Sequence, residues 1–189
     1  MAVKAGKLRN LDEAIKANEL YRRGDQSWRK GHLRPAFRLF LAAARAGMEA
    51  AFSTVGNFYH NGIGVKANPD AALYWYRLAY RSGAHSVANN IGCILRDRKK
   101  FGQAIVWFRR AVQQKDGDAN LNIAKLYLHK GDLVKTCSYL DKTRRSPWAT
   151  EQSKEEARSL LRKMTSMGAD NSGTHRARKG RAGGAPLKR

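Results

Sequence analysis

Five histidines and a sparse set of carboxylates are the residues of this sequence that could perform acid–base or metal chemistry. None of the histidines belongs to a His-Glu-x-x-His motif or lies beside a Cys-x-x-Cys pair, and no Ser/His/Asp spacing or carboxylate pair suggests nucleophilic or general acid–base catalysis. The sequence therefore predicts no catalytic residue, no metal ligand, no cofactor and no small-molecule substrate, in a protein that is not an enzyme. The histidines are His32, His60, His85, His129 and His175.

A pair of glycines, Gly62 and Gly64, could suggest a phosphate-binding loop. The pair lacks the third glycine, the following Lys-Ser/Thr and the preceding strand of such loops, so we interpret it as a connection between helices. Tryptophans could likewise act as stacking platforms for nucleic-acid bases. Trp75 and Trp107 occupy an apolar helix position that favours the core, whereas Trp28 and Trp148 are less constrained.

The charge of the chain limits its partners more than any motif does. Its 189 residues include 37 Lys and Arg against 15 Asp and Glu, a formal net charge of +22. Such a field attracts nucleic acid, acidic proteins or an anionic membrane surface, and it also serves solubility alone. Two isolated cysteines, Cys93 and Cys137, favour a reducing compartment. With no apolar segment long enough for a signal core or a membrane span, we expect a cytoplasmic protein.

Small residues recur as four pairs at regular spacing, and this spacing predicts the helices that must position any functional side chain. Each first member precedes a second small residue by 12, 16, 12 and 12 positions, and each second member precedes the next first member by 20. An invariant spacing beside a variable one is typical of stacked helical repeats. Apolar side chains at helical spacing around each member predict amphipathic helices. The pairs are Gly24 with Ala36, Gly56 with Ala72, Gly92 with Ala104, and Ala124 with Thr136.

The segment from Ala51 to Gly83 resembles a Sel1-like repeat, a relative of the tetratricopeptide repeat. The resemblance covers residues 17–146, and it is specific in this unit because the Gly-x-Gly-Val loop is present. It implies an all-α, right-handed α-solenoid of about four antiparallel helix pairs. The first helix carries polar residues at expected apolar positions, so we interpret it as an N-terminal cap with Tyr21 and Trp28 turned differently. The residues that carry the resemblance are Gly56, Tyr59, Gly62, Gly64, Val65, Ala72, Trp75, Tyr76, Ala79 and Gly83.

The end of the chain predicts a cap and a tail. Ser146 and Pro147 are typical of the N-cap and first position of a helix. That helix would cover the open end of the repeats with Ala157, Leu160, Leu161 and Met164. The following residues have no apolar periodicity and only positive charge, which predicts disorder. The predicted divisions are a flexible N-terminus at 1–10, a repeat domain at 11–146, a capping helix at 147–168 and a disordered basic tail at 169–189.

The resemblance also implies a function, because first helices of such repeats line a concave groove that holds partner proteins. Proteins of this kind are common as bacterial accessory proteins and adaptors. We expect a non-enzymatic interaction module or scaffold whose partner is an acidic protein, since amides can bind extended backbone and cations favour carboxylates. A solvated helix face is the alternative interpretation of the same residues. The expected groove residues are Asn57, His60, Asn89, Arg96, Lys125 and His129.

The basic tail has two interpretations of its own. It could bind nucleic acid without sequence preference, which would make the chain a nucleic-acid-associated protein that uses its basic repeats and tail. It could equally be a solubilising terminus, since no aromatic residue lies among its cations. The residues in question are Arg176, Arg178, Lys179 and Arg181.

Overall fold

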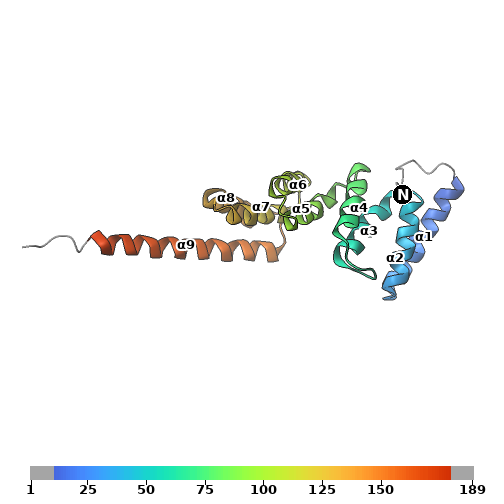
Figure 1. Ribbon diagram of the computed structural model, residues 1–189, viewed down its shortest axis with the longest axis horizontal. Helices are drawn as coiled ribbons and strands as arrows, with labels where there is room; N and C mark the ends of the chain where they lie inside the picture. The colour runs from blue at the N-terminus through green and yellow to red at the C-terminus, as the bar shows by residue number, and fades with distance from the viewer. Residues whose placement is uncertain (1–10, 180–189) are drawn as a thin grey trace, which may run out of the picture. The chain divides into compact units, whose positions relative to one another are not determined.

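The computed structural model describes the backbone of residues 11–179 and the side chains of residues 11–166, and across this part of the chain it is helical without a strand (Figure 1). The predicted all-α fold is confirmed. The chain divides into two compact units, Met1–Ala119 and Asn120–Arg189. The elements are α1 (Leu11–Arg29), α2 (Leu33–Arg45), α3 (Glu49–Asn61), α4 (Pro69–Arg81), the 3-10 turn η1 (His85–Val87), α5 (Ala88–Asp97), α6 (Phe101–Gln113), α7 (Asp118–His129), α8 (Leu133–Arg145) and α9 (Glu151–Lys179).

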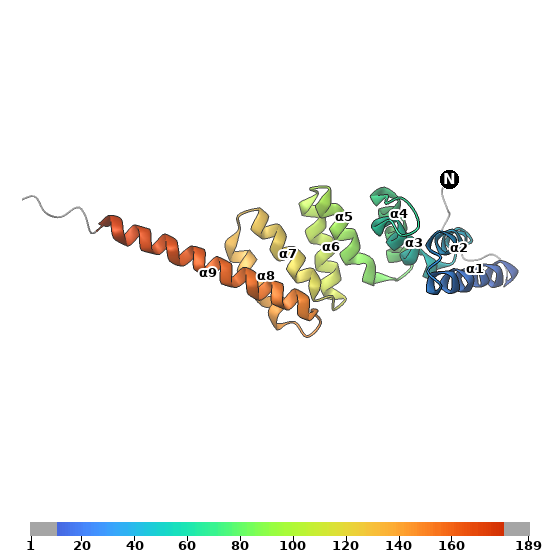
Figure 2. The ribbon, with the colours of Figure 1, turned by 90° about the horizontal axis from the view of Figure 1, so that it is seen from below.

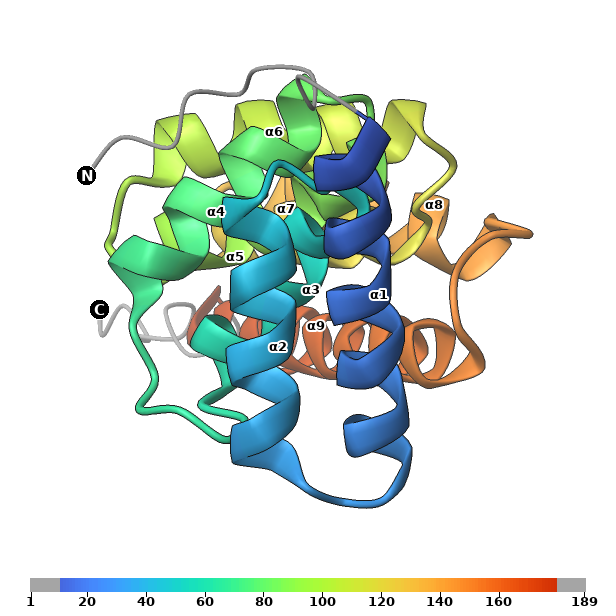
Figure 3. The same cartoon turned by 90° about the vertical axis from the view of Figure 1, so that its right-hand side faces the viewer.

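The first unit consists of helix pairs in which consecutive helices lie side by side, α1 with α2, α3 with α4, and α5 with α6 (Figure 2). Figure 3 shows α1 and α2 running alongside each other, joined by a short turn after Arg29. The amphipathic pattern explains the pairing, because each helix carries one apolar face that must be covered. The largest fully buried side chains of this unit are Tyr76, Phe52, Phe108, Ile91, Ile94, Leu95 and Val55.

The register glycines are contact points between the two helices of a pair. A Cβ atom added to Gly24 would lie 2.9 Å from Cδ1 of Phe40, and one added to Gly56 would lie 2.6 Å from Cδ1 of Tyr76. At Gly92 the corresponding distance, to Cε1 of Phe108, is 2.5 Å. Only a residue without a side chain leaves room for the ring of the second helix at these three positions. At these three pairs the recurring glycine therefore marks where a ring of the second helix packs against the first helix, and α1 keeps this register like α3 and α5.

The loop between α3 and α4 carries the extra residues of its unit. Gly64 has a φ of +63°, and a Cβ atom there would collide with the backbone carbonyl oxygen of Leu33. The loop ends at Asn68, whose side-chain oxygen accepts hydrogen bonds from the backbone N–H of Asp70 and of Ala71, both at 3.1 Å. Asn68 thus caps α4, with Pro69 at the first helical position. The glycine pair is a structural connection, as its sequence context predicted.

The second unit has its own core, formed by side chains of α7, α8 and α9. Tyr127 and Tyr139 stack with ring centroids 5.7 Å apart. The four residues predicted to cover the end of the repeats pack on this cluster, as the sequence indicated. The buried members are Leu121, Ala124, Leu140 and Ala157, and the partly buried ones are Tyr139, Leu160, Leu161 and Met164.

The last helix begins later than the sequence predicted. Ser146 is the C-cap of α8, and its Oγ accepts a hydrogen bond from the backbone N–H of Trp148, at 3.2 Å, in a turn. Thr150 caps α9 instead, because its Oγ1 accepts from the backbone N–H of Ser153 at 3.2 Å. The backbone of α9 continues to Lys179, past the predicted end at residue 168. The disorder predicted for 169–189 stays a prediction, since the side chains from 167 onward and all of 180–189 lie outside the described residues.

Candidate functional site

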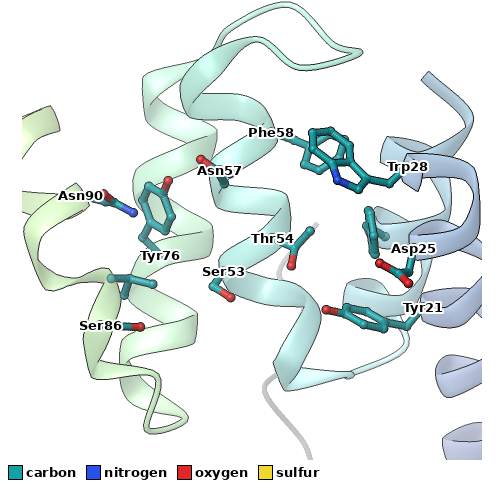
Figure 4. Close-up of a pocket in the computed structure, with 12 residues that line it drawn as sticks. Tyr21, Asp25, Trp28, Ser53, Thr54, Asn57, Phe58, Tyr76, Ser86 and Asn90 are labelled. Atoms are coloured by element: carbon teal, nitrogen blue, oxygen red, sulfur yellow. The ribbon is translucent and has the colours of Figure 1, made fainter. Parts of the chain in front are cut away.

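A groove of about 480 Å³ opens in the first unit over the first helices of its pairs (Figure 4). α1 contributes the aromatic residues Tyr21 and Trp28, while α3 and the η1–α5 segment contribute mainly small polar residues. We name this site the α1–α3–α5 groove. Its full lining is Tyr21, Asp25, Trp28, Phe40, Ser53, Thr54, Asn57, Phe58, Tyr76, Ser86, Val87 and Asn90.

The aromatic wall of the groove is fixed by ring contacts. The ring of Tyr21 meets that of Phe40 edge-on, with centroids 5.1 Å apart. Trp28 lies 5.1 Å from Phe58 by the same measure and is 40% exposed. Packing holds each ring while one side stays open to solvent. The wall is therefore a rigid apolar surface, and little side-chain entropy would be lost when a ligand binds to it.

Tyr76 forms the base of the groove, beneath the register glycine of α3. Burial raises the pKa of Tyr76 to about 12, against the opposing effect of a hydrogen bond from Asn90. Its hydroxyl oxygen lies 3.4 Å from Nδ1 of His60. Burial also lowers the pKa of His60, with nearby Asp97 raising it and Arg96 lowering it further. Both groups are therefore neutral at pH 7, and this polar chain links the groove to the far end of α3.

The polar side chains of the groove suit an extended backbone. Ser53 and Thr54 provide hydroxyl groups, and Asn57 and Asn90 provide amides with both a donor and an acceptor. Oδ1 of Asn57 accepts a hydrogen bond from Nδ2 of Asn61 at 2.5 Å, which orients the exposed amide and leaves its nitrogen as a donor. The lining contains a single charged side chain, Asp25, whose carboxylate pairs with Nε of Arg29 at 2.8 Å. The groove is thus polar and aromatic and is not basic.

Two of the predicted groove residues fall in or next to this site. Asn57 lines it, and His60 reaches it through Tyr76. Asn89 is hydrogen-bonded to Asp116, in the turn between α6 and α7, and does not line the groove. Arg96 pairs through Nε with Oδ1 of its neighbour Asp97 at 2.9 Å. The structure therefore gives Asn89 and Arg96 intramolecular partners.

The other two predicted groove residues belong to the second unit. Nζ of Lys125 lies 2.8 Å from Oε1 of Glu156, so this ion pair joins α7 to α9. His129 is exposed in the last turn of α7. A single groove that includes all six predicted residues stays a prediction, because the α1–α3–α5 groove is formed within the first unit alone.

Several groove residues were not predicted, and the register itself was the signal that could have found some of them. Thr54 and Asn90 both stand two positions before their register glycines. Tyr21 and Ser53 both stand three positions before theirs. The short turn η1 brings Ser86 and Val87 to the groove just before α5 starts. The sequence could have indicated the repeated positions but contains no signal for that turn.

The tryptophans divide as the sequence suggested, with one difference. Trp75 is 5% exposed and packs against Phe52 with centroids 5.7 Å apart. Trp107 is only half-buried, and the guanidinium of Arg110 lies over its ring, with Cζ 4.5 Å from the ring centroid. Trp28 lines the groove, and Trp148 is exposed in the turn before α9.

Two negative observations apply to the described residues. No group of three or more His, Cys, Asp or Glu side chains is placed to hold a metal ion in that part of the chain. No described helix is both long and apolar enough to cross a membrane. The side chains of Arg176, Arg178 and Lys179, and the whole of Arg181, lie outside the described residues, so polyanion binding by the tail stays a prediction.

Paired helices closed by ring-on-glycine contacts, with a groove over the first helices, define an α-helical repeat protein. The Sel1 repeat family model matches residues 33–48, 55–83 and 91–116. These residues form Sel1 repeats, which confirms the resemblance stated above. Sel1-repeat proteins generally mediate protein–protein interactions and are generally non-catalytic scaffolds.

Solved structures support the same fold. A Sel1 repeat protein from Oxalobacter formigenes aligns with a TM-score of 0.55 and 23% identity over 69% of this chain and 58% of that one. Protein c5321, a protective antigen present in uropathogenic Escherichia coli strains and displaying an SLR fold, aligns with a TM-score of 0.61 and 17% identity over 83% of this chain. The present chain spans 58% and 39% of these two proteins. At these identities the likeness shows the α-solenoid fold alone.

Proposed function

We propose that the α1–α3–α5 groove binds an extended segment of a partner protein, and that the chain acts as a non-enzymatic adaptor. The observation that carries this proposal is the lining itself. Two amides and two hydroxyl groups, from Asn57, Asn90, Ser53 and Thr54, lie opposite a wall of packed aromatic rings. Backbone N–H and C=O groups of a bound segment would pair with the amides, and its apolar side chains would contact Trp28 and Tyr21.

The proposed partner is acidic overall, while the segment in the groove need not be. The net charge of +22 accelerates encounter with an acidic partner and makes association sensitive to salt. The groove carries no cation in its lining, so its contribution is recognition of backbone and apolar side chains. Neither Cys93 nor Cys137 forms a disulfide, which is the basis of the accompanying proposal that the protein acts in the cytoplasm.

Charge reversal at Arg96 and Lys125 would be a poor test of this site, because both side chains make ion pairs within the chain. The sharper variant is Trp28→Ala combined with Asn57→Ala, which removes one exposed ring and one exposed amide from the groove. Trp148→Ala is the matched control, since it removes an exposed tryptophan from the second unit. Circular dichroism would establish that all three proteins are folded.

The experiment is affinity capture from host lysate, with and without nuclease treatment, followed by quantitative mass spectrometry. We expect a small set of proteins captured by the parent and by Trp148→Ala, and at least ten-fold less of that set on the groove variant. Equal recovery on all three proteins would contradict groove binding. A set that disappears after nuclease treatment would contradict protein recognition altogether.

A further inference from the structure

A second surface of the first unit has the opposite chemistry to the groove. Residues 70, 74, 77 and 81 follow one another at helical spacing, so they share the outward face of α4. They are Asp70, Tyr74, Arg77 and Arg81, and they line a cavity of about 450 Å³ together with Arg98 and Lys100 from the α5–α6 turn. We name this site the α4 basic pocket.

The turn that completes the pocket has an unusual backbone. Lys99 has a φ of +58°, a left-handed conformation that a residue with a side chain adopts only occasionally. The residues on either side of it, Arg98 and Lys100, both line the pocket. The turn thus adds two cations to the two on α4.

The charges of the α4 basic pocket are not balanced within it. Nη2 of Arg98 lies 2.8 Å from Oδ1 of Asp70, so this carboxylate is already neutralised. Among the described side chains, no ion pair involves Arg77, Arg81 or Lys100. Cations gathered in one pocket without counter-charges repel one another, and an anion bound among them relieves that repulsion.

Tyr74 distinguishes between the anions that could bind. Tyr74 is 42% exposed, and its ring meets that of Trp75 edge-on, with centroids 5.3 Å apart. An exposed ring fixed beside arginines is the arrangement on which unpaired bases stack, while the planar guanidinium groups pair with phosphate oxygens. An acidic polypeptide would satisfy the arginines but would leave the ring without a role.

We propose that the α4 basic pocket binds single-stranded nucleic acid, with a base stacked on Tyr74 and backbone phosphates on Arg77, Arg81 and Lys100. The strand must be single because the bases of a duplex are paired and stacked, with no face open to a side chain. This proposal is independent of peptide binding, since the α1–α3–α5 groove shares none of these residues.

The test compares two variants with the same change in net charge. Arg77→Glu/Arg81→Glu reverses two charges in the pocket, and Arg34→Glu/Arg38→Glu reverses two exposed charges four residues apart on α2. Affinity of the full-length chain for a fluorescently labelled twelve-nucleotide RNA would be measured by anisotropy between 50 and 200 mM KCl. Tyr74→Ala tests the stacked base, and an unlabelled duplex and poly-glutamate serve as competitors.

We expect the pocket variant to bind at least ten-fold more weakly, with a salt slope lower by about 0.7 for each lost phosphate contact. The α2 variant should lose less than three-fold, and Tyr74→Ala should lose roughly ten-fold. Equal losses in both double variants would overturn the proposal in favour of a diffuse field. Undiminished binding by Tyr74→Ala, or competition by poly-glutamate as effective as that by single-stranded RNA, would overturn it in favour of an acidic protein partner.

Discussion

The ring-on-glycine contact is the smallest feature on which the fold depends, and it distinguishes glycines that are necessary from glycines that are not. A Cβ atom at Gly92 would meet the ring of the fully buried Phe108, which has no room to move. Gly102, only ten positions later on α6, has nothing within 4 Å of the position its Cβ would occupy.

Gly92→Ala should lower the free energy of unfolding by about 1–3 kcal/mol, because the added methyl group would overpack the contact between α5 and the ring of Phe108 on α6. Gly102→Ala is the matched control and should not lower it, since the added methyl group meets no neighbour within 4 Å and alanine favours a helix more than glycine does. Urea denaturation followed by circular dichroism measures both. A Gly92→Ala protein as stable as the parent would show that the ring contact does not close the pair.

His60 gives a prediction about pH. Burial lowers its pKa in the folded chain, so just below pH 6.5 the unfolded chain binds more protons than the folded chain. Its contribution to stability is present above that pH and is lost as the pH falls toward the folded-state pKa. Between pH 7.5 and 5.5 the melting temperature of the His60→Asn variant should therefore fall less than that of the parent. His32→Asn removes an exposed histidine and should behave as the parent, and identical pH dependence in all three would refute the role of His60.

At the scale of the element, the helices differ in whether the side chain of the N-cap residue caps the first turn. Asn68 caps α4 with two hydrogen bonds, whereas His32 holds the N-cap position of α2 without a side-chain bond. Asn68→Ala should cost about 1 kcal/mol of unfolding free energy, and His32→Ala should change it far less. Thermal melts of the two variants beside the parent provide the comparison, and equal costs would contradict the capping role of Asn68.

The elements also show what the sequence could and could not reveal. Spacing alone predicted the helix pairs, because a small residue at a fixed register has one geometric reason to recur, and Asn57 was found on the correct face for the same reason. Spacing could not reveal that Arg96 and Lys125 are ion-paired, since long side chains choose partners only after helices pack. The prediction that Ser146 caps the last helix was wrong, because Thr150, which is also a good N-cap residue, caps α9 and Ser146 ends α8.

At the scale of the whole molecule, the net charge of +22 opposes compactness. Repulsion among like charges is screened by salt, so the melting temperature should rise between 50 and 500 mM NaCl. The Arg34→Glu/Arg38→Glu variant carries less positive charge and should show a smaller rise. Differential scanning fluorimetry measures both proteins, and a melting temperature that falls with salt in the parent would show that its ion pairs outweigh the repulsion.

The ring-on-glycine contacts within the helix pairs have an evolutionary consequence. Each register glycine and its ring belong to the same pair of helices, so the contact travels with the segment that encodes it. An in-frame duplication of a helix pair copies both the glycine and the ring that packs on it. A deletion of a whole pair removes both together, so no aromatic side chain is left without its packing partner. Repeat number can therefore change by whole units between descendants of one gene, whereas insertions accumulate in the connections, as in the loop that carries Gly64.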